Sequence, residues 1–492
     1  MKIAGEASIE PLPVALYTPS MIKPRRVHRW PACCVSLFLI LSLGASCRAI
    51  APLLPSAPSA PAEDEETRIS REFRREAKKY FKFANHPEVE RYVDRIARRI
   101  LSATGPLGYD YRFFVVEEDQ LNAFAVPGGS IYVFTGLIER AKSTDELAGV
   151  LGHEIVHIKG RHMARSSGVD AISVLSLLAG ALLARSGSGA QAAAIVGQAV
   201  SATRQAAYSR QLEMESDTLG TRYMAAAGFD PRGTLAFLKT MEQERQLNPI
   251  DVPAYILSHP LTQERVANAE LVVKAINPNR PRSEDNEALK KVQILIRLER
   301  GNREAVVAEY EKLAQKDPNN AELLHLLGFA QFQTGQLAPA QKNYEKSWRL
   351  RPDHLGLLRE IGRLSSQTGD HESAHKAFNR AIALEPSEAL NFYYFGEFLE
   401  KIGDLRGAAG AYLNAQNLAP VWDKPVYRLG QVYGKLDRLA DGYYYLGRAQ
   451  LLQDDDERAI ADYERALKIV GEKSPRGQVI KEELNVLKNR KH

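Results

Sequence analysis

The chain has 492 residues, of which 45% are hydrophobic and 25% are charged. This length leaves room for two or three domains, and this composition excludes both a disordered chain and a protein that crosses a membrane many times. Much of the formal net charge of +5 lies before Cys47, so the remainder gives no electrostatic reason to expect a nucleic-acid partner.

Residues 1–46 have the layout of a secretory signal. The basic stretch "MIKPRRVHRW" precedes the apolar run "ACCVSLFLILSLGAS", which ends in small residues and is too short to favour a membrane-spanning helix. We therefore expect an exported protein. A start at Met1 and a start at Met21 both stay open, because the first twenty residues add nothing to the signal.

Cys47 follows "LGAS", which resembles a bacterial lipobox except that Gly44 stands where leucine is usual. Lipidation of Cys47, and with it a peripheral contact with a membrane, stays open. Cys33 and Cys34 would leave with the signal, so the exported chain would hold one cysteine and no internal disulfide. Residues 47–68 form a Pro/Ala-rich linker that cannot bury a core.

The segment 69–275 predicts a mixed α+β domain. Helices are expected over "REFRREAKKYFKF" and "PEVERYVDRIARRILSAT", and strands over "YDYRFFVVEED" and "SIYVFTGLI". Between the strands, "NAFAVPGGS" predicts an edge strand that ends in a turn. The alanine-rich stretch 168–203 is expected to form a helical hairpin packed on the core of this domain, and contact with a membrane surface or with unfolded chains is the alternative.

The C-terminal half carries a repeat of 34 residues. In one register lie Pro318, Pro352, Pro386 and Pro420, then Gly328, Gly362, Gly396 and Gly430, and after the first three glycines Ala340, Ala374 and Ala408 and the aromatic residues Tyr344, Phe378 and Tyr412. Small residues where helices cross and an aromatic residue in the second helix are typical of the tetratricopeptide repeat, TPR. We predict an all-α TPR solenoid over 284–470, with 284–317 as a degenerate first repeat. Near the end Gly447 and Tyr463 restore the pattern after a slip, so one helix would serve two repeats.

The string "LGHEIVHIKGRH" begins at Leu151 and predicts a zinc site. His153 and His157 are four residues apart and share one helix face, and the preceding "STDE" is a capping-box signature for the start of that helix. Two neutral imidazoles at this spacing can bind zinc, and Glu154 can act as the general base. His162 falls about half a helical rotation from His153 and is left out of the predicted site.

A catalytic zinc ion needs a third protein ligand. In "YSRQLEMESDTLG", Glu213 and Asp217 are four residues apart on one face of a second predicted helix. Glu213 can supply the third ligand, and Asp217 can accept a hydrogen bond from the second nitrogen of a ligand histidine. The alternative is that these acidic residues form an ordinary solvated helix face.

Four segments, "NAFAVPGGSIYVFTG", "HEIVH", "SRQLEMESD" and "SHPLTQER", resemble the HtpX-like and Oma-like gluzincin metallopeptidases. With the signal and the repeats, the chain is similar from about residue 70 to about residue 470 to the BepA-like branch, periplasmic metalloproteases with chaperone-like roles in outer-membrane protein assembly. The resemblance implies a zincin-like metalloprotease domain in the periplasm, with one Zn²⁺ held by His153, His157 and Glu213 and with Glu154 as the base. It also implies that "AFAVPGGS" lies along the cleft, where an extended substrate can add as a strand.

The same resemblance gives roles to two residues of "SHPLTQER". His259 corresponds to a histidine that can become a regulatory fourth ligand, which would turn an open catalytic site into a closed, latent one. Arg265 corresponds to an arginine that stabilises the oxyanion. The alternative is a loop histidine and a surface arginine.

These observations together predict a zinc metalloendopeptidase that cleaves misfolded or stalled envelope proteins. Its repeats would bind those proteins or the outer-membrane assembly machinery. The alternative is a chaperone or assembly factor with a latent zinc site, although the intact Glu154 argues against a dead one. A small-molecule hydrolase is disfavoured, because a peptide-binding repeat array would have no purpose in it.

Overall fold

The computed structural model of the chain describes residues 63–106, 108–165, 209–247, 254–276, 286–352 and 354–489. All of them belong to one unit of the chain, which spans Ser56–His492. The predicted signal, Cys47 and the apolar stretch 168–203 lie outside the described residues. Within the described residues, no helix is long and apolar enough to cross a membrane.

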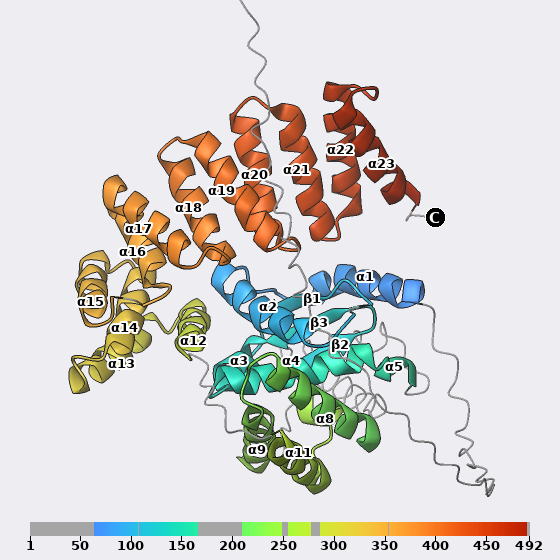
Figure 1. Cartoon of the computed structure of the whole chain (residues 1–492), viewed down its shortest axis with the longest axis vertical. Helices are drawn as coiled ribbons and strands as arrows, with labels where there is room; N and C mark the ends of the chain where they lie inside the picture. The colour runs from blue at the N-terminus through green and yellow to red at the C-terminus, as the bar shows by residue number, and fades with distance from the viewer. Residues whose placement is uncertain are drawn as a thin grey trace, which may run out of the picture. The chain divides into compact units, whose positions relative to one another are not determined.

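The elements fall into two groups along the chain (Figure 1). The first group contains β1 (Arg112–Val116), β2 (Ala123–Val126), β3 (Ser130–Phe134), α1 (Glu63–Tyr80), α2 (Pro87–Ser102), α3 (Thr135–Arg140), α4 (Thr144–Lys159), α5 (His162–Arg165), α8 (Arg210–Ala226), α9 (Arg232–Leu247), α10 (Ala254–Ser258) and α11 (Gln263–Ala275). The second group contains α12 (Glu287–Glu299), α13 (Arg303–Lys316), α14 (Ala321–Gln333), α15 (Leu337–Leu350), α16 (Leu357–Thr368), α17 (His371–Leu384), α18 (Ala389–Lys401), α19 (Leu405–Leu418), α20 (Asp423–Lys435), α21 (Leu439–Leu452), α22 (Asp456–Val470) and α23 (Pro475–Asn489). The predicted order, an α+β domain followed by an all-α array, is confirmed.

The sheet has the strand order β1-β3-β2, with β3 parallel to β1 and antiparallel to β2. β2 is therefore an edge strand, as the sequence predicted. Phe114, Tyr132 and Phe124 lie opposite one another across the three strands, and the ring of Tyr132 stacks on the other two with centroids 5.0 and 4.8 Å away. This row of rings fixes the register of the edge strand, because a slip of one residue would turn its side chains to the other face.

Helices cover both faces of the sheet. Side chains alternate between the two faces along each strand, and in β2 and β3 the side chains on both faces are buried. On one face, Phe124 and Tyr132 contact Phe73 of α1, with ring centroids 5.9 and 5.3 Å away. On the other face, Ile131 and Val133 join the core that α2 and α4 contribute to. The helix with the HEIVH motif is therefore anchored directly on the sheet.

Two predicted boundaries were wrong near this sheet. The strand expected up to Ile138 ends at Phe134, because the backbone N of Gly136 and the hydroxyl of Thr135 both donate to the carbonyl of Glu118 and start α3 instead. Helix α1 begins at residue 63, inside the stretch expected to be linker. Residues 63–68 of the expected linker are therefore helical.

The repeat glycines lie where paired helices cross. A Cβ on Gly328, Gly362 or Gly396 would lie 2.7–3.0 Å from the ring of the aromatic residue sixteen positions later. Gly447 of α21 meets the ring of Tyr463 of α22 in the same way, while α21 also packs on α20. One helix thus serves two pairs, as the slipped register predicted.

The array continues beyond residue 470, where the prediction ended it. Helix α23 packs Ile480, Leu484 and Leu487 against Tyr444 and Tyr463. The last helices of a solenoid need such a cover for their apolar face. The 34-residue period could not predict α23, because the sequence of this helix does not continue the pattern.

Helix α1 also contacts the loop between α21 and α22. Arg74 donates from Nε and Nη2 to the two carboxylate oxygens of Asp454, each at 2.7 Å, and both side chains are buried. Arg74 also donates to the hydroxyl of Ser130, at the start of β3, at 3.1 Å. One arginine therefore connects the repeat array to the hairpin that carries the edge strand.

Replacing Arg74 by alanine is expected to lower the free energy of unfolding by about 3–5 kcal/mol, because the buried carboxylate of Asp454 would lose both hydrogen bonds and keep, among the described residues, only Arg112, whose Nη1 lies 4.0 Å away. The matched control is Arg68→Ala on the same helix, whose ion pair with Glu72 is exposed and contributes about 0.2–0.5 kcal/mol. The midpoints of thermal unfolding of the two variants measure the difference. Equal midpoints would show that the buried pair contributes no more than the exposed one.

Candidate metal centre

Helix α4 begins where the sequence predicted. The hydroxyl of Ser143 accepts a hydrogen bond from the backbone N of Glu146 at 3.1 Å, which caps the helix. From this start, the helical rotation directs His153, Glu154 and His157 into the interior, where each is at most 3% exposed. The motif therefore lies in the core of the first group of elements.

Two glycines let α4 and α8 approach each other closely. A Cβ on Gly220 of α8 would lie 2.8 Å from the carbonyl carbon of Gly152 and from the backbone N of His153 on α4. The backbones of α4 and α8 are thus in close contact at Gly152, the residue before His153. This crossing brings Glu213 and Asp217 of α8 alongside α4.

We expect Gly220→Ala to separate these helices, to cost about 1–3 kcal/mol of stability and to reduce the bound metal. The reason is that the added methyl group has only rigid backbone to displace. The matched control is Gly410→Ala in α19, where a Cβ would meet nothing within 4 Å and where alanine is the better helix former. Thermal midpoints and metal content measure both variants, and an unchanged Gly220→Ala protein would contradict the expectation.

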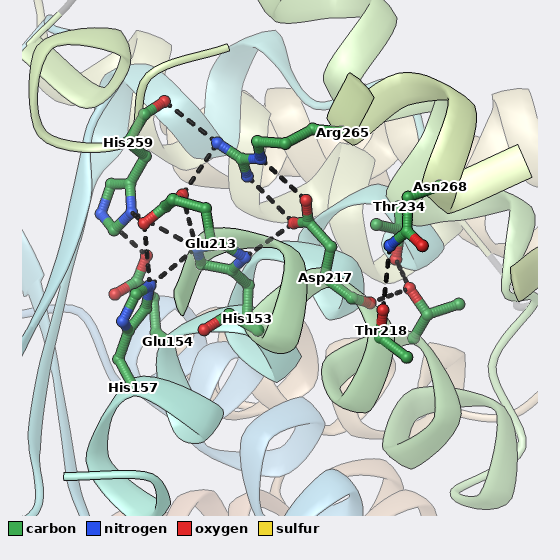
Figure 2. Close-up of polar contacts among 12 residues, drawn as sticks. His153, Glu154, His157, Glu213, Asp217, Thr218, Thr234, His259, Arg265 and Asn268 are labelled. Carbon is green, nitrogen blue, oxygen red and sulfur yellow. Dashed lines mark hydrogen bonds and ion pairs between the residues drawn. The ribbon is translucent and has the colours of Figure 1, made fainter. Parts of the chain in front are cut away.

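Four side chains converge on one point (Figure 2): His153 and His157 from α4, Glu213 from α8 and His259 from just after α10. Nε2 of His153 lies 2.9 Å from Nε2 of His157 and 3.3 Å from Nδ1 of His259. Oε1 of Glu213 lies 3.1 Å from Nδ1 of His259 and 3.4 Å from Nε2 of His157. All four side chains are buried.

These distances fit a zinc ion. Tetrahedral ligands at about 2.0–2.1 Å from zinc lie about 3.3 Å from one another, and the four separations above run from 2.9 to 3.4 Å. Glu154 gives a second indication, because it is fully buried and neither of its carboxylate oxygens has a hydrogen-bond partner. A buried carboxylate is costly without a hydrogen-bond partner, so its oxygens can accept a hydrogen bond from a group that enters the centre.

Asp217 and Arg265 form a pair of charges behind the four donors. Oδ1 of Asp217 lies 2.9 Å from Nδ1 of His153, which is the contact expected for it. Arg265 donates from Nε and Nη2 to Asp217 at 2.8 and 2.9 Å. Its Nη1 lies 2.8 Å from Oε2 of Glu213 and donates to the backbone carbonyl of His259 at 3.1 Å.

The expected oxyanion role of Arg265 stays a prediction, and the structure gives the contacts of its side chain. The side chain is 1% exposed, and all three guanidinium nitrogens contact protein oxygens. It thus orients Asp217 and Glu213 and fixes the segment that presents His259. The alternative of a surface arginine is wrong, because the side chain is buried.

His162, which the sequence analysis left out, lies beside the centre. Its Nδ1 is 3.0 Å from Nδ1 of His157 and 3.2 Å from the hydroxyl of Ser216, and the side chain is fully buried. The half-rotation argument assumed a continuous helix. However, α4 ends at Lys159 and Arg161 has a φ of 50°, so the chain turns and brings His162 back.

Burial and charge act in opposite directions on the pKa values of the donors. Burial lowers the pKa of His153, but the carboxylates of Glu213 and Asp217 more than offset this and raise it to about 10. Burial holds the pKa of His157 well below its usual value. Burial raises the pKa of Glu213, but His259 and His153 bring it well below the usual value. A metal ion must displace the proton on His153 in order to bind, so its affinity should fall as the pH falls.

Comparisons with known proteins match both halves of the chain. Residues 84–272 match peptidase family M48, and residues 321–354, 360–388 and 440–469 match the tetratricopeptide repeat. Among solved structures, "MamA 41-end from Desulfovibrio magneticus RS-1" is 21% identical and covers 35% of this chain and 98% of that chain, with a TM-score of 0.30. That score is too low to carry an argument.

Two curated relatives each match part of the chain. The "Beta-barrel assembly-enhancing protease" of Escherichia coli (strain K12) is 30% identical over 218 residues, which are 43% of this chain and 44% of that protein. The "Mitochondrial metalloendopeptidase OMA1" of Schizosaccharomyces pombe is 31% identical over 181 residues, 36% of this chain and 51% of that protein. The matched part of this chain thus covers about half of the length of each relative.

Proposed function

Since the chain carries a peptidase family M48 domain followed by tetratricopeptide repeats, we propose that it is a zinc-dependent endopeptidase. The observation that carries this proposal is the convergence of His153, His157 and Glu213 beside the buried carboxylate of Glu154, which has no hydrogen-bond partner. The two relatives described above are a protease and a metalloendopeptidase by name. Their names support the same reaction.

His153, His157 and Glu213 would hold the zinc ion, which when bound supplies Lewis-acid polarisation of the scissile carbonyl and of the attacking water. Glu154 takes one proton from that water on its carboxylate as the carbon–oxygen bond forms. It then delivers this proton to the leaving nitrogen as the carbon–nitrogen bond breaks. Asp217 accepts a hydrogen bond from the Nδ1–H of His153 and so keeps Nε2 directed at the centre.

The substrate is a polypeptide in extended conformation. β2 is an edge strand, and a small pocket is lined both by His157 and by Ala125, Val126 and Pro127 at the end of that strand. A chain that adds to the outer side of β2 would pair its backbone there and pass beside the centre. This geometry favours unfolded segments over folded ones, because only an extended chain can pair with a strand edge.

His259 acts as a regulatory fourth ligand in this proposal. Its Nδ1 lies 3.1–3.3 Å from the Glu213 and His153 ligand atoms, and its Nε2 lies 3.6 Å from Oε1 of Glu154. A ligand in this position takes the place that the attacking water needs. The same observation favours the second candidate function, a chaperone or assembly factor in which the centre stays closed.

We place the action of this enzyme in the periplasm, on misfolded or stalled envelope proteins. The layout of residues 1–46 supports export, and the relative from Escherichia coli is named for β-barrel assembly. The repeat array would bind these substrates or the outer-membrane assembly machinery, since stacked repeats present a groove for peptides and proteins.

Removing the metal is expected to abolish cleavage of an unfolded model protein, because Glu154 then faces a water that is not acidified. The exported chain would be treated with a zinc chelator or with its non-chelating isomer, and zinc would then be added back. Gel electrophoresis of the substrate measures cleavage. Cleavage that survives in zinc-free protein would contradict the proposed reaction.

A further inference from the structure

His162 is a buried histidine to which the proposed reaction gives no part. It lies on α5, just after the end of α4, and its side chain is fully buried. Nδ1 of His162 is 3.0 Å from Nδ1 of His157, and the two rings are nearly perpendicular, with centroids 4.9 Å apart. His162 therefore approaches a metal ligand from the side that faces away from the centre.

The metal centre determines which nitrogen of His157 carries a proton. Nε2 of His157 faces the centre, 2.9 Å from Nε2 of His153 and 3.4 Å from Oε1 of Glu213. A neutral imidazole that binds a metal through Nε2 keeps its proton on Nδ1. This N–H needs an acceptor, because a buried donor without one loses the hydrogen bonds that it makes in water. Nδ1 of His162 lies where that acceptor is needed.

The tautomer of His162 follows from the same constraint. A proton on Nδ1 of His162 would face the N–H of His157, so Nδ1 must be the accepting nitrogen and Nε2 must carry the proton. Oγ of Ser216 lies 3.2 Å from the same Nδ1 and is buried. A hydroxyl can rotate to donate or to accept, so Ser216 is compatible with this tautomer.

The backbone after α4 is shaped so that the ring of His162 reaches His157. Arg161 has a φ of 50°, which is costly for a residue other than glycine and persists where the surroundings hold it. Nε of Arg161 donates to Oε1 of Glu66 in α1 at 2.9 Å, which holds this turn. A Cβ on Gly160 would lie 2.6 Å from Cδ2 of His162 and closer still to its Nε2. The turn and the glycine together leave room for the imidazole at this place.

We propose that His162 is a positioning residue for the ligand His157. Its Nδ1 accepts a hydrogen bond from the Nδ1–H of His157 and keeps Nε2 of that ring directed at the centre. Asp217 makes the corresponding contact with Nδ1 of His153 at 2.9 Å, so each ligand histidine of α4 has an acceptor behind it. The inference rests on the proposed function, because it requires His157 to bind zinc.

The test compares His162→Asn with His162→Leu. The two new side chains have nearly the same shape, but only asparagine offers an oxygen acceptor near the place of Nδ1. Zinc affinity of the exported chain is measured by competition with a chromophoric chelator. We expect leucine to weaken zinc binding by about 10–100-fold, and asparagine to restore most of the affinity. The matched control is Lys159→Ala at the same helix end, where Nζ donates to the carbonyl of Pro106. It should leave the affinity unchanged.

A role in packing alone predicts a different result, because asparagine and leucine fill the same space. Equal zinc affinities of His162→Asn and His162→Leu therefore overturn the proposal. If His162→Leu does not fold, as judged by the thermal midpoint of the metal-free protein, Gly160→Ala is the second variant. Its methyl group pushes the ring away from His157 while the imidazole is retained, so the zinc affinity should fall, and an unchanged affinity overturns the proposal.

The measurement needs no cleavage, so it separates this inference from the proposed function. A wild type that binds no zinc contradicts the proposed function and this inference with it. A wild type that binds zinc no more tightly than His162→Leu contradicts only the role of His162. A loss of affinity in His162→Leu that His162→Asn largely restores supports the hydrogen bond, whether or not a cleaved substrate has been found.

Discussion

Replacing Glu154 by glutamine is expected to abolish peptide-bond cleavage while the zinc content stays unchanged. Glu154 is not among the four converging donors, and its carboxylate oxygens have no hydrogen-bond partner. Glutamine fills the same space but cannot accept the proton of the attacking water. General acid–base catalysis contributes about 10²–10⁴-fold to such reactions, so cleavage should fall by at least that factor.

The matched control for this change is Glu215→Gln. Glu215 lies on α8, two residues from Glu213, but its side chain is one-third exposed and pairs with Arg165 at 3.3 Å. Both variants remove one carboxylate near the centre, and only Glu154→Gln removes the base. Degradation of an unfolded model protein and zinc per chain are measured together. Cleavage that continues in Glu154→Gln at full zinc occupancy would assign the base to another group.

The same variant separates the two candidate functions in cells. A protease loses its cellular role when Glu154 becomes glutamine, because turnover is the role. A chaperone with a closed centre keeps its role, since the zinc-bound fold and the repeat array are intact. Complementation of a strain that lacks the protein, with wild type and Glu154→Gln side by side, distinguishes them.

The sequence predicted those parts of the centre that depend on one helix. His153 and His157 share a face because they are four residues apart, and the same spacing puts Glu213 and Asp217 on one face of α8. The positions of the repeat glycines were also predictable, because in a 34-residue repeat the small residues recur where helices cross. Each of these predictions needs only the rotation per residue within one helix. None of them requires knowing which elements pack against each other.

The remaining parts depend on contacts between segments, which spacing does not contain. The positive φ of Arg161 returns His162 to the centre, and no short-range pattern indicated this turn. The direction of Arg265 follows from the packing of α11 on α8. The approach of α4 to α8 follows from Gly152 meeting Gly220, and a glycine inside a helical pattern does not reveal its partner.

Replacing His259 by alanine is expected to raise cleavage by about tenfold or more and to leave zinc bound. Three donors, His153, His157 and Glu213, remain, and three protein ligands with one open position are the arrangement of catalytic zinc sites. In wild type, the open state must form before reaction, and its small population reduces the apparent activity by that fraction. Alanine removes the competing nitrogen, so the enzyme starts from the open state.

The neighbouring change Ser258→Ala is the matched control, because it alters the same segment and leaves the imidazole in place. The ring of His259 stacks on Tyr255 at 4.5 Å, and its carbonyl is held by Arg265. In the proposed function, this support keeps the histidine at the centre until a substrate on the edge strand displaces it. Cleavage and zinc content of His259→Ala, Ser258→Ala and wild type are compared on one unfolded substrate. If His259→Ala loses its zinc and its activity together, the histidine is a structural ligand and the closed-centre chaperone becomes the better description.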